Sequence, residues 1–253
     1  KVFQMFCNRA ELFERDEPGT KEETVSAIKI EDYIIKLSDA APLWFNIHNS
    51  NDTVLQKVLL LSSSKDVKIF VLALLTFADD QTYAKILLKL ERLLFRTRLI
   101  WLFDERNLAT WARDIYANPN NLIAVEQQID SLLGSPLSNE NLIQSMNLLF
   151  TYVKGNKGFH RWGTLKYFLF EYENKLKNDA DEKNDKIKLS EFDETTIEHV
   201  IPQQYWDHWK DEVDDFLIGI PEDNHAMAAK VLINTLGNLT ILKGGKNSSL
   251  GKK

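Results

Sequence analysis

The fold is decided by two stretches near the C-terminus, Glu198-His199-Val200-Ile201-Pro202 and Leu236-Gly237-Asn238-Leu239-Thr240-Ile241-Leu242. β-Branched residues dominate 195–201, and this run stops at Pro202, as a short strand would. We expect a second strand over 238–242, a turn at Gly244-Gly245 and a helix beginning near Asn247. The order of these elements predicts a ββα unit, in which a strand pair is followed by a helix.

The residue types in this unit suit phosphodiester hydrolysis. Mg²⁺ prefers oxygen ligands and takes only one or two from the protein, and the Glu198 carboxylate and the Asn247 amide could supply them. His199 could accept a proton from the attacking water. Asn238 cannot be a base, but its amide could hold the hairpin or orient the imidazole. Because successive strand residues face opposite sides, Glu198 and His199 reach one site only if the strand bends or ends there.

Each of these residues also has a structural interpretation. Asn247 could simply cap the last helix, and Glu198 could form hydrogen bonds within the hairpin. We expect Trp206 and Trp209 to pack in the core or between domains, His208 to lie on a helix surface, and His225 to stand in the first turn of a helix.

The rest of the chain has a helical pattern. The apolar run 67–77 has the length of a core helix, and apolar residues recur every three or four positions over 83–101. Similar stripes are expected over 54–61, 65–77, 122–133, 142–153 and 164–176. We therefore predict a mainly α protein, with a helical-bundle scaffold ahead of the ββα unit.

Composition divides the chain into three parts. Residues 1–176 form the expected scaffold, 177–194 a charged, solvated linker, and 195–253 the C-terminal domain. Helices over 205–216 and 223–233 are expected between the two strands. The closing helix is cut off at Lys253, and the first residue is Lys1 rather than Met, so we expect a fragment of a longer protein.

Charge separates the C-terminal end from the remainder. The chain has a net charge of −6, yet 236–253 contains four lysines and no acidic residue. This distribution is expected of a phosphate-facing surface on an acidic scaffold. Lys243, Lys246 and Lys252 are the candidate phosphate contacts, although ordinary solvated lysines would look the same.

Cysteine and hydropathy exclude several classes of protein. One cysteine, Cys7, excludes an internal disulfide and a thiolate zinc site, and is consistent with a reducing, cytoplasmic compartment. No run of apolar residues is long enough for a membrane span.

The two stretches, with Asn247-Ser248 after them, resemble the C-terminal HNH region of GmrSD-type restriction endonucleases. The helical segment around Lys166–Glu173 is also similar to this family. The resemblance implies an α-helical region followed by an HNH site with one divalent metal, Mg²⁺ or Mn²⁺. It implies His199 as general base, Asn238 as the middle residue of the triad and Asn247 at the last, metal-binding position. Glu198 stands where many HNH enzymes have Asp.

The resemblance also implies a function. It indicates a DNA endonuclease of a modification-dependent or modification-linked phage-defence system, nicking DNA or cutting both strands. The partners would be phage DNA and a ParB-like nucleotide-hydrolysing domain of the same protein, N-terminal to this chain; a homo-oligomer is left open. The alternative is a degenerate DNA-binding or regulatory module that keeps the HNH-like fold without catalysis.

Overall fold

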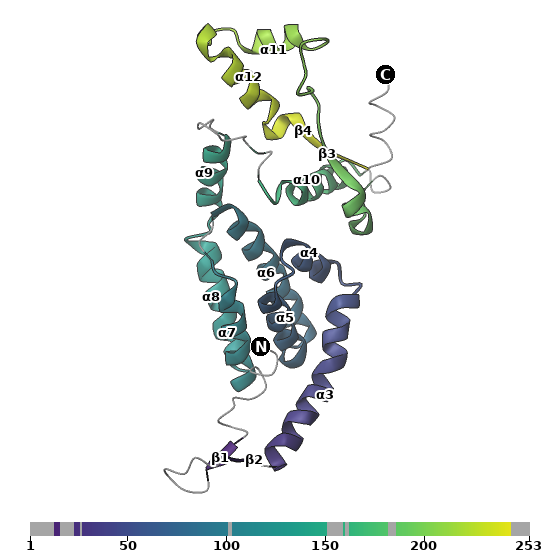
Figure 1. The fold of residues 1–253 in the computed structure, drawn as a ribbon, viewed down its shortest axis with the longest axis vertical. Coiled ribbons are helices and arrows are strands. Elements are labelled where there is room, and N and C mark those ends of the chain that lie inside the picture. Colours follow the sequence, from purple (N-terminus) through teal and green to yellow (C-terminus); the bar gives the residue numbers. More distant parts are fainter. Residues whose placement is uncertain are drawn as a thin grey trace. The chain divides into compact units, whose positions relative to one another are not determined.

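The computed structural model describes residues 13–15, 23–25, 27–100, 103–150, 159, 162–181 and 186–243. These residues belong to two compact units (Figure 1). The N-terminal unit comprises Lys1–Thr97 and Trp101–Ser138, and the C-terminal unit comprises Arg98–Ile100 and Asn139–Lys253.

Helices account for most of the described residues, which confirms the prediction of a mainly α protein. The helices before the second strand pair are α3 (Ala27–Asn49), α4 (Thr53–Leu61), α5 (Lys65–Phe77), α6 (Asp80–Ile100), α7 (Arg106–Ala117), α8 (Asn121–Gly134), α9 (Asn139–Phe150) and α10 (Leu165–Asp179). The structure also contains a short antiparallel pair near the N-terminus, β1 (Phe13–Arg15) and β2 (Glu23–Val25).

Helix α5 forms the centre of the N-terminal unit. Val67, Phe70, Val71 and Leu74 are completely buried, and α3 and α7 pack against this helix. The prediction of a core helix over this apolar run is confirmed. Since a helix that is apolar on nearly all sides must be surrounded, the neighbouring helices need only one apolar face each.

Helix α6 has one apolar face, and the spacing of its apolar residues predicts it. Five of its buried side chains follow the predicted three- and four-residue spacing: Ile86, Leu87, Leu90, Leu93 and Leu94. The helix begins where Asp79 accepts a 2.8 Å hydrogen bond from the backbone N–H of Thr82. This bond satisfies one of the donors left unpaired at a helix N-terminus and lowers the pKa of the Asp79 carboxyl.

The contact between α6 and α8 is polar at one edge. Glu126 of α8 forms salt bridges with Lys85, at 2.6 Å, and with Lys89, and Lys89 also reaches Asp130 at 2.7 Å. Hydrogen bonds from Lys85 and then Lys89 hold the pKa of the Glu126 carboxyl below its usual range. Glu126 therefore favours the folded state only while it is ionised.

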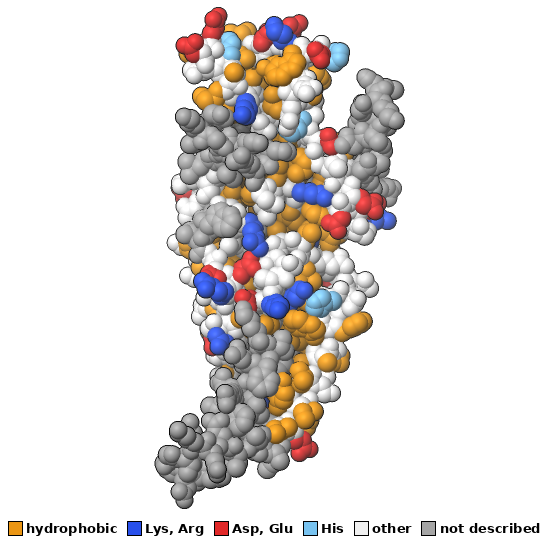
Figure 2. All heavy atoms as spheres, in the orientation of Figure 1, with side chains coloured by type: hydrophobic (Ala, Val, Ile, Leu, Met, Phe, Trp, Pro, Cys, Tyr) orange, Lys and Arg blue, Asp and Glu red, His pale blue; other side chains and the backbone are white. Residues whose placement is uncertain are grey.

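Helix α3 keeps much of its apolar surface exposed. Figure 2 shows hydrophobic side chains gathered along it, and the exposed ones are Ile30, Ile34, Ile35, Leu37 and Phe45. Among the described residues, no helix combines the length and apolar character needed to cross a membrane.

The C-terminal unit is built on a second strand pair beside α10. Strand β3 (Thr195–His199) pairs antiparallel with β4 (Leu239–Lys243), and β4 packs against α10 (Figure 1). Buried Leu239 and Ile241 of β4 meet a helix whose Leu165, Leu169 and Phe170 are also buried. The predicted strands are present, although β3 ends two residues before the expected position and β4 is shifted by one.

The stretch 177–194, expected as a solvated linker, contains packed residues. Ile187 and Phe192 are buried, and residues 189–194 form a 3₁₀ helix, η3 (Leu189–Glu194). The Phe192 ring meets the Phe170 ring edge-on, with centroids 5.3 Å apart. The Phe192 side chain thus docks this charged stretch onto α10. The compact units divide near residue 138.

A small subdomain is inserted between β3 and β4. It contains α11 (Lys210–Phe216), the 3₁₀ turn η4 (Glu222–Asn224) and α12 (His225–Ile233), and a second 3₁₀ turn, η5 (Leu236–Asn238), leads into β4. Val213, Leu217 and Ala229 form its core, with Tyr205 and Leu232 packed against them. Helix α11 begins five residues later than expected, because residues 201–209 form bends and turns. His225 stands in the first turn of α12, as predicted.

We predict that Glu126→Gln lowers the free energy of unfolding of the N-terminal unit at neutral pH by about 1 kcal/mol. A carboxyl with a lowered folded-state pKa contributes its stability above its unfolded pKa, and this contribution is lost as the pH falls through the folded pKa. Urea titrations at neutral and at acidic pH should therefore show a smaller pH dependence for the variant.

Asp32→Asn is the matched control for this prediction. It removes one charge from an exposed pair with Lys36 on α3 and should change stability little. An equal effect of the two substitutions at all pH values would show that the Glu126 cluster does not stabilise the fold.

Candidate active site

The strand pair places Glu198 and His199 at the edge of the inserted subdomain. In the register, Glu198 lies opposite Thr240 and His199 lies opposite Leu239. Opposed residues share a face, so Thr195, Leu239 and Ile241 lie on one face, and all three are buried. This face packs towards α10, and the alternate face carries Glu198.

The chain bends directly after Glu198 and His199. Strand β3 ends at His199, and Val200 and Ile201 form a bend. Both site side chains are half-buried. Because both residues lie within β3, the register places His199 on the face of Leu239 and Glu198 on the face of Thr240, with the bend directly after them.

Asn238 determines where this turn occurs. Its side-chain oxygen accepts a 2.6 Å hydrogen bond from the backbone N–H of Ile201. Its amide nitrogen donates to the carbonyl oxygens of Ile201, at 3.0 Å, and Ile233, at 2.8 Å. The backbone carbonyl of Asn238 also accepts a bond from Val200 N–H, at 2.9 Å.

These bonds distinguish between the two roles considered for Asn238. The residue is buried and ends the turn η5, one position before β4 rather than within the strand as expected. An amide has two hydrogens, and both are used by backbone carbonyls. Asn238 therefore holds the hairpin and has no hydrogen left to donate to the imidazole.

Gln203 is a neighbour of His199 that the sequence analysis missed. Its side-chain nitrogen lies 3.4 Å from Nε2 of His199, so it can donate weakly to that nitrogen when the nitrogen carries no proton. The only signal was its position, four residues after the histidine and directly beyond Pro202.

The two tryptophans expected in packing positions are at the surface. Trp206 is 58% exposed and Trp209 is 37% exposed, so the expectation of core burial is wrong. The core of the subdomain is filled by smaller, aliphatic side chains instead, those of Val213, Leu217 and Ala229. His208 is exposed, as expected, but lies in the turns before α11 rather than on a helix.

The remaining predicted site residues lie at or beyond the end of the described chain. Lys243 is the last residue of β4, opposite Thr195. Lys246, Asn247 and Lys252 fall outside the described residues.

The donors present are compatible with a hard cation held by few protein ligands. Within the described part of the chain, no group of three or more His, Cys, Asp or Glu side chains could hold a metal ion. Glu198 supplies one carboxylate. Since Mg²⁺ usually keeps several waters and takes one or two carboxylates, one such donor on the hairpin fits that chemistry.

Residues 143–253 match the GmrSD restriction endonucleases, C-terminal domain. The resemblance inferred from the two stretches is confirmed for this part of the chain, which is similar to the C-terminal domain of these restriction endonucleases. No curated protein and no solved structure matches the chain.

The limits of the GmrSD match agree with the structural division. The match begins at 143, and the main segment of the C-terminal unit begins at Asn139. The matched region therefore contains α10, the strand pair, the inserted subdomain and both site residues, Glu198 and His199.

We predict that Asn238→Asp lowers the free energy of unfolding of the C-terminal unit by about 1–3 kcal/mol, the usual cost of an unsatisfied buried polar group. A carboxylate would oppose the two carbonyl oxygens that the amide now satisfies. Asn234→Asp is the matched control, because the Asn234 side chain makes one exposed hydrogen bond, to the Lys230 carbonyl. Thermal unfolding measures both variants, and equal melting temperatures would remove Asn238 from its structural role.

Proposed function

We propose that this chain is the metal-dependent HNH endonuclease module of a restriction system and hydrolyses phosphodiester bonds in DNA. One observation carries the proposal: the Glu198-His199 pair stands where β3 ends, within the region that matches the GmrSD C-terminal domain. If the chain were only a helical interaction scaffold, it would not need this pair of residues at the end of the strand.

His199 is the proposed general base. Imidazole is the usual proton acceptor at neutral pH, and the 3.4 Å contact with Gln203 indicates a direction from which Nε2 can be approached. A water molecule in the place of the Gln203 amide would lose its proton to Nε2 as it attacks phosphorus. Asn238 keeps the imidazole in position indirectly, by fixing the backbone of residues 200 and 201.

Glu198 and Asn247 are the residues that would hold the divalent metal, Mg²⁺ or Mn²⁺. When bound, such an ion neutralises charge that develops on the phosphate and stabilises the leaving oxygen. Lys243, Lys246 and Lys252 are proposed to contact neighbouring phosphates, as expected for lysines in an acid-free segment.

The biological setting follows from the same family. We propose phage DNA as the substrate, a cytoplasmic location without membrane association, and a ParB-like nucleotide-hydrolysing domain as the partner within the full protein. Nucleotide hydrolysis would belong to that partner domain. A second copy of the chain, in a homo-oligomer, is the further candidate partner.

We predict that His199→Ala lowers the rate of DNA cleavage by about 10²–10⁴-fold, the usual cost of losing a general base. Supercoiled plasmid is the substrate, and circular dichroism checks that the variant folds. His208→Ala is the matched control, since His208 is exposed in the same subdomain and should be dispensable. A His199→Ala rate within about threefold of the wild type would exclude the general-base role.

We further predict that cleavage requires Mg²⁺ or Mn²⁺ and stops in EDTA. Glu198→Gln and Asn247→Ala should each raise the metal concentration needed for half-maximal cleavage, because each removes a proposed oxygen ligand. Manganese binding followed by calorimetry should weaken in parallel. DNA binding without cleavage or metal binding would favour the degenerate DNA-binding module instead.

A further inference from the structure

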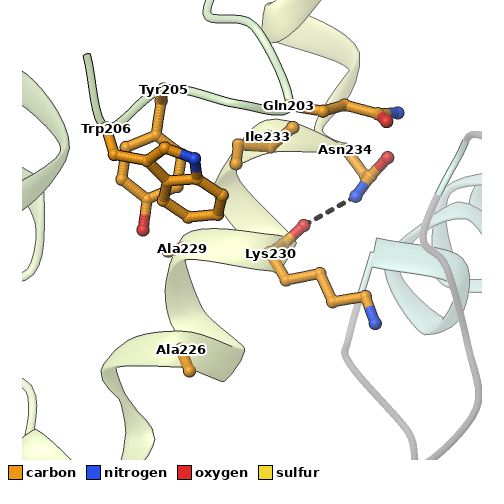
Figure 3. Close-up of a pocket in the computed structure, with 8 residues that line it drawn as sticks. All are labelled: Gln203, Tyr205, Trp206, Ala226, Ala229, Lys230, Ile233 and Asn234. Atoms are coloured by element: carbon orange, nitrogen blue, oxygen red, sulfur yellow. Dashed lines mark hydrogen bonds between the residues drawn. The ribbon is translucent and has the colours of Figure 1, made fainter. Parts of the chain in front are cut away.

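A cavity of about 510 Å³ lies beside the candidate active site. Figure 3 shows it between the segment after β3 and one side of α12. Its lining consists of Gln203, Tyr205, Trp206, Ala226, Ala229, Lys230, Ile233 and Asn234. This volume is in the range of sites that bind small molecules or single nucleotide units.

The cavity presents an aromatic surface. Trp206 and Tyr205 have ring centroids 4.6 Å apart, with their planes inclined at 49°. Trp206 keeps 58% of its surface exposed, although burying an indole is usually favourable. Across from these rings, Ala226 and Ala229 lie on one side of α12 and leave the space open (Figure 3).

Polar groups occur at the edges of this apolar space. Gln203 and Asn234 carry amides that can donate to and accept from the edge of a planar heterocycle. Asn234 uses its nitrogen for one bond, a 2.8 Å bond to the Lys230 carbonyl. Lys230 is exposed and forms no salt bridge within the described part of the chain, and Figure 3 shows its side chain extended from α12.

The charge around the cavity indicates what it would bind. Residues 200–238 contain seven acidic residues and two lysines, and one of these, Lys210, is paired with Asp214 at 3.0 Å. Such a subdomain repels a run of phosphates. The cavity lining has no acidic residue and one lysine, so it suits one base and its own phosphate better than a duplex backbone.

We propose that this cavity holds a single DNA base rotated out of the helix, stacked on Trp206, with Lys230 facing its phosphate. The proposal rests on the proposed nuclease function, and Gln203 connects the two sites because it lines the cavity and contacts His199. Stacking on an aromatic ring accepts any base, and unpairing costs least at a mismatch. The bound base would hold the strand next to the phosphate that His199 addresses.

The test measures binding separately from cleavage. Fluorescence anisotropy in EDTA compares a short duplex containing one mismatch with the fully paired duplex. The full chain should bind the mismatched duplex about tenfold more tightly. Trp206→Ala and Ala226→Leu should each weaken mismatch binding by about tenfold or more, the first by removing the stacking surface and the second by filling the cavity.

Two controls match these substitutions. Met227→Ala alters an exposed residue of α12 that does not line the cavity and should leave binding unchanged. His199→Ala should abolish cleavage but keep the mismatch preference. Trp206 and Ala226 are both exposed, so their substitution leaves the core of the subdomain intact, which thermal unfolding verifies.

Cross-linking identifies the contact directly. A photoreactive 5-iodouracil at the mismatch should cross-link to Trp206 or Tyr205, as mapped by mass spectrometry. Equal binding of both duplexes, undetectable DNA binding, or unchanged affinity in Trp206→Ala and Ala226→Leu would overturn the proposal. Self-association that Ala226→Leu abolishes would instead identify the cavity as a protein contact, and would overturn it too. Cleavage that survives His199→Ala refutes the nuclease mechanism alone.

Discussion

The three hydrogen bonds of one buried amide, that of Asn238, determine the geometry of the C-terminal unit. They join Ile201, where the inserted subdomain begins, to Ile233, where its last helix ends. The insertion is therefore closed at its base, and β3 has to stop at His199. Closing a long loop costs little more than closing a short one, so few contacts are needed to hold the base of the insertion together. The Glu198-His199 pair thereby acquires a fixed backbone without lying in the interior.

The spacing of apolar residues along the sequence predicted the helices and strands that bury only one face. The spacing of Ile86, Leu90 and Leu94 gave α6, and the β-branched run before Pro202 gave β3 to within two residues. Contacts between distant segments could not be foreseen. Phe192 lies in a charged stretch, yet docks on Phe170 of α10. Trp206 stays exposed because small and aliphatic residues already fill the core of the subdomain. The Gln203 contact depends on the bend after β3, which a strand pattern does not encode.

The two units differ in how they achieve stability. The N-terminal unit surrounds a helix that is apolar on nearly every side, as the complete burial of Val67, Phe70 and Leu74 shows. The C-terminal unit divides its apolar residues between the α10–hairpin contact and the three-residue core of the insertion. Small cores bury less surface, so polar bonds such as those of Asn238 account for more of the unit's stability. The family match begins near the boundary between the units, as expected if the matched region folds as a separate part.

The acidic character of the insertion has a consequence for specificity. The acidic insertion lies next to the candidate site and repels phosphates. It therefore weakens binding to DNA that contacts the protein only through its sugar-phosphate backbone. Binding energy must then come from groups that the backbone lacks, and the acid-free cavity beside Gln203 offers aromatic stacking and amide hydrogen bonds. Lysines at the end of the chain would supply attraction without sequence preference, and the insertion would oppose it. Selectivity between DNA sites depends on the difference between the attraction by the lysines and the repulsion by the insertion. An acidic insertion is therefore compatible with the proposed DNA-cleaving site, and it would make cleavage there more selective.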